Sequence, residues 1–116
     1  MASSVGSLVH FSIPVRNIKE SSQFYSKIFG WKLKEMTSTY YMIEGGIGAL
    51  SVESENVSGT MPILYFSVQD IQACLKQVEN CGGTIVLNKM NSGDGSSFFA
   101  TFRDINGVVI GIWSNQ

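Results

Sequence analysis

A single histidine, His10, is the residue of this sequence whose side chain titrates nearest to neutral pH. Its imidazole can act as a general base, hydrogen-bond a small molecule, or stay buried on backbone partners, and the sequence leaves these interpretations open. The chain has no glycine-x-serine-x-glycine motif, so the residues do not indicate a serine hydrolase. Any chemistry at His10 therefore depends on what the fold brings next to it.

The two cysteines, Cys74 and Cys81, stand seven positions apart in a predicted helix. Seven helical residues rise about 10.5 Å. A disulfide does not bridge Cα atoms more than about 7 Å apart. The pair has no Cys or His neighbours and does not predict a zinc site. Free thiols suit a reducing compartment, so we expect a cytoplasmic protein.

The charge balance and the composition restrict the class of protein. Eight Lys and Arg residues stand against nine Asp and Glu residues, so there is no basic excess to bind nucleic acid. With 44% hydrophobic residues, we expect a single domain over residues 1–116. Residues 1–7 do not resemble a signal peptide, and the longest apolar stretch, 108–113, is too short to cross a bilayer. We expect neither nucleic acid nor a membrane as partner.

The elements that must position His10 begin with the strand that contains it. Residues 8–15 alternate in apolarity as a strand does. Asn17 is a good N-cap for a helix that Gly30 ends. Three short strands are predicted at 31–36, 40–43 and 47–53. The order strand, helix, three strands defines module one, residues 8–53.

Residues 61–113 repeat this order as module two, after a polar linker at 54–60. A strand is predicted at 63–68, and Asp70 is the N-cap of an amphipathic helix that ends at Gly82. Strands follow at 84–90, 98–103 and 108–113, the last two joined by the hairpin signal Asn106-Gly107. The modules align at a separation of 53 residues, as from Val15 to Val68, whereas the final hairpin aligns at 61.

Three phrases in these elements are specific in combination: LVHFSIPV at the start, SSQFYSKIFGWKL in the first helix and FRDINGVVIGIW at the end. With the paired modules they resemble the vicinal oxygen chelate superfamily of glyoxalases, bleomycin resistance proteins and extradiol dioxygenases. The resemblance covers residues 8–113. It implies an α+β fold in which two βαβββ modules form a curled mixed-sheet half-barrel around a small-molecule pocket, and a homodimer.

Enzymes of this superfamily hold a divalent metal on four side chains, and the resemblance assigns each of these positions to a residue of this sequence. The first-strand histidine matches His10. The second position, 53 residues on, is Ile63, and the last-strand glutamate falls on Gly111. The fourth position, 61 residues before Gly111, is Leu50. Leu, Ile and Gly side chains offer no metal donor, so we expect no metal and no cofactor.

A metal-free pocket for a small apolar or aromatic molecule is the function that we predict. Even steps along a strand keep side chains on one face, which puts Tyr65 beside Ile63 and Trp113 beside Gly111. The small Gly111 leaves room for a ligand. We predict no catalytic residue. The expected ligand-binding residues are His10, Tyr65, Trp113, Leu50, Ile63, Gly111, Tyr40 and Arg103.

Several alternatives stay open at this point. The chain could be a metal-dependent glyoxalase-like lyase or dioxygenase with non-standard ligands, such as Glu44 or Glu53, or an enzyme in which His10 acts alone as acid and base. Tyr65 and Trp113 could fill the core, and Arg103 could cap a hairpin rather than bind an anion. A protein-interaction role is a third class of function.

Overall fold

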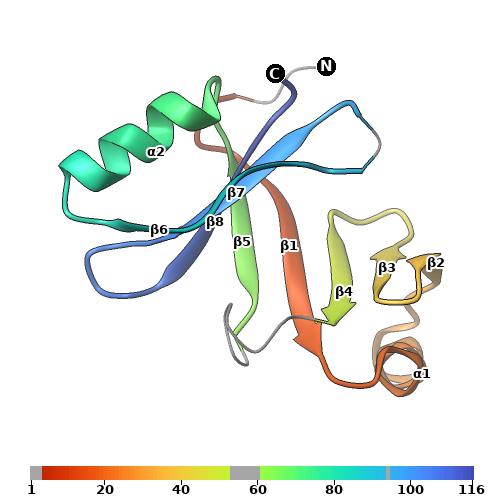
Figure 1. The fold of residues 1–116 in the computed structure, drawn as a ribbon. Coiled ribbons are helices and arrows are strands. Elements are labelled where there is room, and N and C mark those ends of the chain that lie inside the picture. Colours follow the sequence, from red (N-terminus) through yellow and green to blue (C-terminus); the bar gives the residue numbers. More distant parts are fainter. Residues whose placement is uncertain (1–3, 53–60, 94) are drawn as a thin grey trace. The chain divides into compact units, whose positions relative to one another are not determined.

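The computed structural model describes residues 4–52, 61–93 and 95–116, and these contain two helices and eight strands (Figure 1). The predicted linker 54–60 and Glu53 lie outside the described residues. The elements are β1 Leu8–Val15, α1 Ile18–Phe29, β2 Leu33–Thr37, β3 Tyr40–Ile43, β4 Gly48–Val52, β5 Ile63–Ser67, α2 Ile71–Asn80, β6 Thr84–Asn91, β7 Phe98–Arg103 and β8 Val109–Ser114. Strand, helix and three strands occur twice in this order, which confirms the predicted α+β fold of two βαβββ modules.

The chain divides into two compact units that follow the modules except near the starts of β1 and β5. The first unit is His10–Ile63, and the second unit joins Met1–Val9 to Leu64–Gln116. The N-terminal segment is tied to the second unit by two backbone hydrogen bonds. Gly6 N–H donates to the Ser67 carbonyl at 2.8 Å, and Ser67 N–H donates to the Ser7 carbonyl at 3.0 Å.

The first unit contains a mixed sheet in the order β2-β3-β4-β1. β1 and β4 are parallel, whereas β3 is antiparallel to both β4 and β2. The Asn17 side chain accepts from Glu20 N–H at 3.0 Å and begins α1, as predicted. Gly30, at φ 70°, ends the helix in a left-handed conformation that favours glycine. Ile18, Tyr41 and Leu50 form the core between α1 and the sheet.

The second unit repeats this arrangement with strands in the order β5-β8-β7-β6. β5 and β8 are parallel, and β7 is antiparallel to both of its neighbours. The Asp70 carboxylate accepts from Ala73 N–H at 3.0 Å and begins α2. The core under this helix consists of Ile71, Leu75, Ala100 and Ile112. Each helix therefore covers one face of its own sheet.

The first strand after α1 begins two residues later than the sequence pattern indicates. The first strand after α1 is predicted from Trp31, whereas β2 starts at Leu33. The Trp31 ring instead packs against Tyr25 and Phe29, with ring centroids 5.2 and 5.0 Å away, and the Trp31 carbonyl accepts from Ser26 Oγ at 2.7 Å. These contacts hold Trp31 against the end of α1 and outside the sheet.

Two findings concern the expectations about compartment and membrane. Cys74 and Cys81 are both free thiols, and burial raises the pKa of Cys74. Neither helix in the described part of the chain combines the length and the apolar character that a membrane span requires.

Candidate functional site

In the first unit, alternate residues of β1 and β4 point to opposite faces of the sheet. Ile13 and Leu50 are register partners and pack on the side of α1. Ser12 and Ala49 are the neighbouring pair in the register, so both lie on the face opposite α1. His10 precedes Ser12 by two residues on β1 and shares that face.

Leu50 does not lie on the face of His10, contrary to the prediction. Its side chain is 0% exposed and packs with Ile18 and Tyr41 in the core beneath α1. It therefore cannot line a site that His10 also lines on this sheet. The neighbouring β4 residue that does lie on the face of His10 is Ala49, which is also 0% exposed.

The pairing register shows that the sequence alignment placed the counterpart of Gly111 one residue too late on β4. Ser12 and Tyr65 are equivalent positions, 53 residues apart. Ser12 pairs with Ala49, and Tyr65 pairs with Gly111. The structural counterpart of Gly111 is thus Ala49, 62 residues earlier rather than 61. A shift of one residue moves a strand side chain to the other face of its sheet.

His10 forms a hydrogen-bonded pair with Tyr40. His10 Nε2 lies 3.1 Å from Tyr40 Oη, and the two ring centroids are 6.4 Å apart. Burial lowers the pKa of His10 below its usual 6.5, and a hydrogen bond to the backbone of Ile47 acts in the opposite direction. At neutral pH the imidazole is therefore uncharged.

Ala49 pairs with Met42 on β3, and Tyr40 pairs with Ser51, two residues after Ala49 on β4. Met42 and Tyr40 therefore share the face of Ala49, opposite α1.

In the second unit, a tyrosine ring occupies the place that Gly111 leaves open. Ile112 packs under α2, so its neighbour Gly111 lies on the opposite face together with its register partner Tyr65. A Cβ atom at Gly111 would overlap the Tyr65 ring. The expectation that Gly111 leaves room for a ligand is therefore corrected. Phe99 packs edge-on against Tyr65, with ring centroids 6.3 Å apart.

Trp113 and Thr101 share this face of the second unit. Trp113 follows Gly111 by two residues and lines a hollow of about 140 Å³. Thr101 is the β7 register partner of Gly111 and is 1% exposed. Among the described residues, its hydroxyl has no hydrogen-bond partner. Sequence reasoning missed Phe99 and Thr101, although their even spacing on one strand and the register of the hairpin would have placed both beside Gly111.

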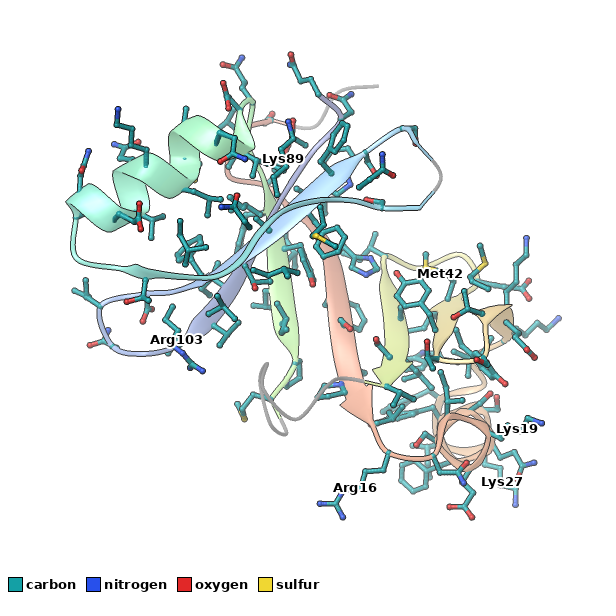
Figure 2. All side chains as sticks on the ribbon, viewed as in Figure 1. Arg16, Lys19, Lys27, Met42, Lys89 and Arg103 are labelled. Atoms are coloured by element: carbon teal, nitrogen blue, oxygen red, sulfur yellow. The ribbon has the colours of Figure 1, made fainter. Side chains whose placement is uncertain are left out.

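Ile63 and Arg103 are the remaining predicted site residues. Ile63 is buried, with 2% exposure. The Arg103 side chain lies beside the β7–β8 hairpin (Figure 2), and its Nη1 donates to the Gly107 carbonyl at 3.2 Å. The hairpin is also closed by Asp104, whose carboxylate accepts from the N–H groups of Asn106 and Val108. Arg103 thus supports the turn, as its alternative interpretation expected.

A larger hollow lies away from the predicted site. It measures about 410 Å³ and is open beside α1, lined by Pro14, Val15, Glu20, Ser21, Phe24 and Tyr25. None of the predicted ligand-binding residues contributes to it. Glu20 is the charged residue of its described lining.

The residues at the superfamily's metal positions do not fit a metal ion. With Ala49 in place of Leu50, the four positions hold His10, Ala49, Ile63 and Gly111, which supply one donor side chain. In residues 4–52, 61–93 and 95–116, no three His, Cys, Asp or Glu side chains gather into a cluster that could bind a metal ion. Glu44 is exposed at its turn, and Glu53 lies outside the described residues.

Comparison with solved structures shows the same fold in several proteins of low sequence identity. A structure described as an NAD-dependent benzaldehyde dehydrogenase from Legionella pneumophila has a TM-score of 0.67 at 16% identity, covering 92% of this chain and 98% of that chain. Methylmalonyl-CoA epimerase from Streptomyces coelicolor, in complex with 2-nitronate-propionyl-CoA, has a TM-score of 0.69 at 15% identity, covering 97% and 96%. A glyoxalase/bleomycin resistance protein/dioxygenase superfamily member from Vibrio splendidus 12B01 has a TM-score of 0.64 at 15% identity, covering 90% and 95%. At sequence identities this low, the structural similarity shows the fold and does not indicate a ligand.

No curated protein matches the chain at a significant level. The model of one protein family does match it, over residues 7–112, and spans both βαβββ modules. The chain therefore belongs to the Glyoxalase/Bleomycin resistance protein/Dioxygenase superfamily.

Proposed function

We propose that this protein binds a small apolar or aromatic molecule, without a metal, on the sheet faces opposite its helices. One observation carries the proposal: the rings of Tyr65 and Phe99 pack edge-on against each other on the face opposite α2, with the Tyr65 ring over Gly111. Aromatic rings on an open sheet face suit an apolar or aromatic guest.

The residues beside two of the superfamily's metal positions, Gly111 and Ala49, support the same proposal. The Tyr65 ring stands over Gly111, and the Tyr40 hydroxyl lies 3.1 Å from His10 Nε2. Each unit therefore presents aromatic surface and a few polar atoms where related enzymes would have a glutamate. This chemistry is typical of small-molecule recognition sites, which combine apolar walls with one or two orienting polar groups.

Metal content and ligand binding test the proposal together. Elemental analysis of the purified protein should find no stoichiometric zinc, nickel, manganese or iron. In a thermal shift screen run with EDTA, a small aromatic compound that binds should raise the melting temperature. The reason is that binding stabilises the folded state by RT ln(1 + [L]/Kd). Stoichiometric metal, or stabilisation by metal that grows with its concentration, would contradict metal-free binding and favour the lyase or dioxygenase alternative.

The two tryptophans provide a matched pair for locating the ligand. Trp113 lies on the face opposite α2, whereas Trp31 packs on Tyr25 and Phe29 near the end of α1. A compound that binds as proposed should change the intrinsic fluorescence of the wild type and of Trp31→Phe. It should leave the fluorescence of Trp113→Phe unchanged. The reverse pattern would move the site to the α1 side of the first unit.

We propose a homodimer and a cytoplasmic location as further parts of this assignment. The support for the dimer is the apolar surface of α1, where Phe24, Ile28 and Phe29 are 58%, 58% and 59% exposed. The support for the cytoplasm is the exposed free thiol of Cys81, which suits a reducing compartment. Cell fractionation tests the location, and recovery only in an oxidising compartment would contradict it.

A further inference from the structure

The outward side of α1 carries two exposed apolar side chains between two opposite charges. Phe24 and Ile28 stand one helical turn apart, and each is 58% exposed. Glu20 is the acidic residue of the first turn, and Lys27 is the basic residue of the last turn. Both charged side chains are exposed, and Lys27 extends from α1 away from its sheet (Figure 2). The helix therefore presents an apolar centre with an acidic and a basic end.

The helical repeat fixes where these residues stand relative to Phe24. Each residue of a helix rises about 1.5 Å and turns about 100°. Glu20 thus lies about 6 Å before Phe24 along the axis. Lys27 lies about 4.5 Å after Phe24, and Ile28 about 6 Å after it. Around the axis, Glu20 and Lys27 fall on one side of Phe24, whereas Ser21 and Ile28 fall on the other.

The hollow of about 410 Å³ beside α1 opens on the first half of this helix. Glu20, Ser21, Phe24 and Tyr25 line it together with the end of β1. Ile28 stands on the second half of the helix and is not part of the described lining. The Ile28 side chain of a second copy would reach this hollow if the two helices ran in opposite directions.

A two-fold axis beside Phe24 and perpendicular to α1 produces that arrangement and keeps matching sides of the two helices together. The partner's Ile28 then comes level with Glu20, on the side of Ser21, where the hollow opens. The partner's Lys27 comes within about 1.5 Å of the level of Glu20, on the same side. In a parallel pair, each Lys27 would instead be level with the partner's Lys27. Charge complementarity therefore favours the antiparallel pair.

We propose that two copies of this chain pack their α1 helices antiparallel about Phe24, with the partner's Ile28 in the hollow and Glu20 paired with the partner's Lys27. This inference rests on the homodimer of the proposed function and adds the contacts that specify it. Each contact occurs twice in such an isologous interface, so association ends at two copies. The apolar contacts supply affinity, and the two ion pairs set the direction of the helices.

Charge reversal tests the direction of the helices. Glu20→Lys and Lys27→Glu each replace both ion pairs of the dimer by like charges. Sedimentation equilibrium at low ionic strength should show a dimer dissociation constant raised about five- to thirtyfold by either change alone, as the loss of two exposed pairs and their replacement by repulsion predict. The combined variant restores both pairs with reversed sign. Its dissociation constant should return to within about threefold of the wild type.

Lys19→Glu is the matched control, because it makes the same change of charge on the same helix. Lys19 is exposed and lies about 140° around the helix from Phe24, away from the proposed contact. Its dimer dissociation constant should stay within about twofold of the wild type. Circular dichroism should show the same helix content in all variants, since every substituted side chain is exposed.

The outcomes separate this inference from the proposed function. A dimer that both single reversals leave intact, or that the combined variant fails to restore, would overturn the antiparallel packing and leave a homodimer with other contacts. Equal weakening by Lys19→Glu and Lys27→Glu would reduce the effect to net charge and would also overturn it. If the wild type is a monomer, the proposed homodimer and this inference fail together, and the proposed ligand binding keeps its own tests.

Discussion

At the scale of single residues, Gly111 and Tyr65 act as one unit. Replacing Gly111 by Ala puts a methyl group into the space that the Tyr65 ring holds. We expect Gly111→Ala to lower the free energy of unfolding by about 1–3 kcal/mol, as overpacking does. Urea denaturation in a Tyr65→Ala background should show almost no further loss from Gly111→Ala. An equal loss in both backgrounds would mean that the ring is not what Gly111 accommodates.

The hydroxyl of Thr101 leads to a prediction of opposite sign. Thr101→Val keeps the shape of the side chain but removes a buried oxygen that has no partner in the described part of the chain. The free energy of unfolding should rise by about 1 kcal/mol, because a buried hydroxyl without a hydrogen bond is unfavourable. Thr84→Val, at an exposed strand position, is the control and should change little. A destabilised Thr101→Val would show that the hydroxyl is satisfied.

His10 should make the stability of the protein depend on pH. Because burial lowers the pKa of His10 in the folded state, the unfolded state binds a proton more readily just below pH 6.5. This contribution to stability is complete above pH 6.5 and is lost as pH falls through the folded pKa. Urea denaturation of the wild type and of His10→Gln from pH 7.5 to 5.5 should show a steeper decline for the wild type. Parallel curves would argue that His10 titrates alike in both states.

At the scale of elements, the parallel register of β1 and β4 decides what each residue contacts. Leu50 is fully buried against α1, so Leu50→Ala should cost about 2–5 kcal/mol in the free energy of unfolding. The folded variant should bind a small aromatic compound found in the thermal shift screen with an affinity within about twofold of the wild type, because Leu50 faces away from His10. Denaturation and calorimetry check the two parts. Intact stability with weakened binding would return Leu50 to the ligand face.

At the scale of the whole molecule, the exposed apolar side chains of α1 predict self-association. Light scattering on a sizing column should give twice the chain mass of 12.7 kDa. Phe24→Ser combined with Ile28→Ser should shift the protein toward the monomer, since both residues are more than half exposed on α1. Met90→Ser, exposed on β6 of the second unit, is the control. A monomeric wild type, or a dimer that survives the double substitution, would refute an interface on α1.

Local chemistry was enough to predict most of the fold. The caps Asn17 and Asp70, the terminator Gly30 and the Asn106-Gly107 turn act within a few residues of themselves, and the structure confirms each. The strands also follow, because apolar alternation is a local pattern. Trp31 is the exception, since rings on the neighbouring helix hold it outside the sheet.

The candidate site depended on contacts that no local pattern encodes. Tyr40 reaches His10 across thirty residues of sequence, and the Tyr65 ring fills the place of Gly111 from another strand. The assignment of Leu50 to the face of His10 was out by one residue, which reverses the face of a strand side chain. The sequence by itself therefore determined the elements, their duplicated order and the residue types at the superfamily's metal positions, three of which have no donor side chain, because these follow from residue type and short spacing. Only the tertiary structure decided which side chains share a face and where each hydrogen bond runs, because register and packing join residues that are distant in the chain.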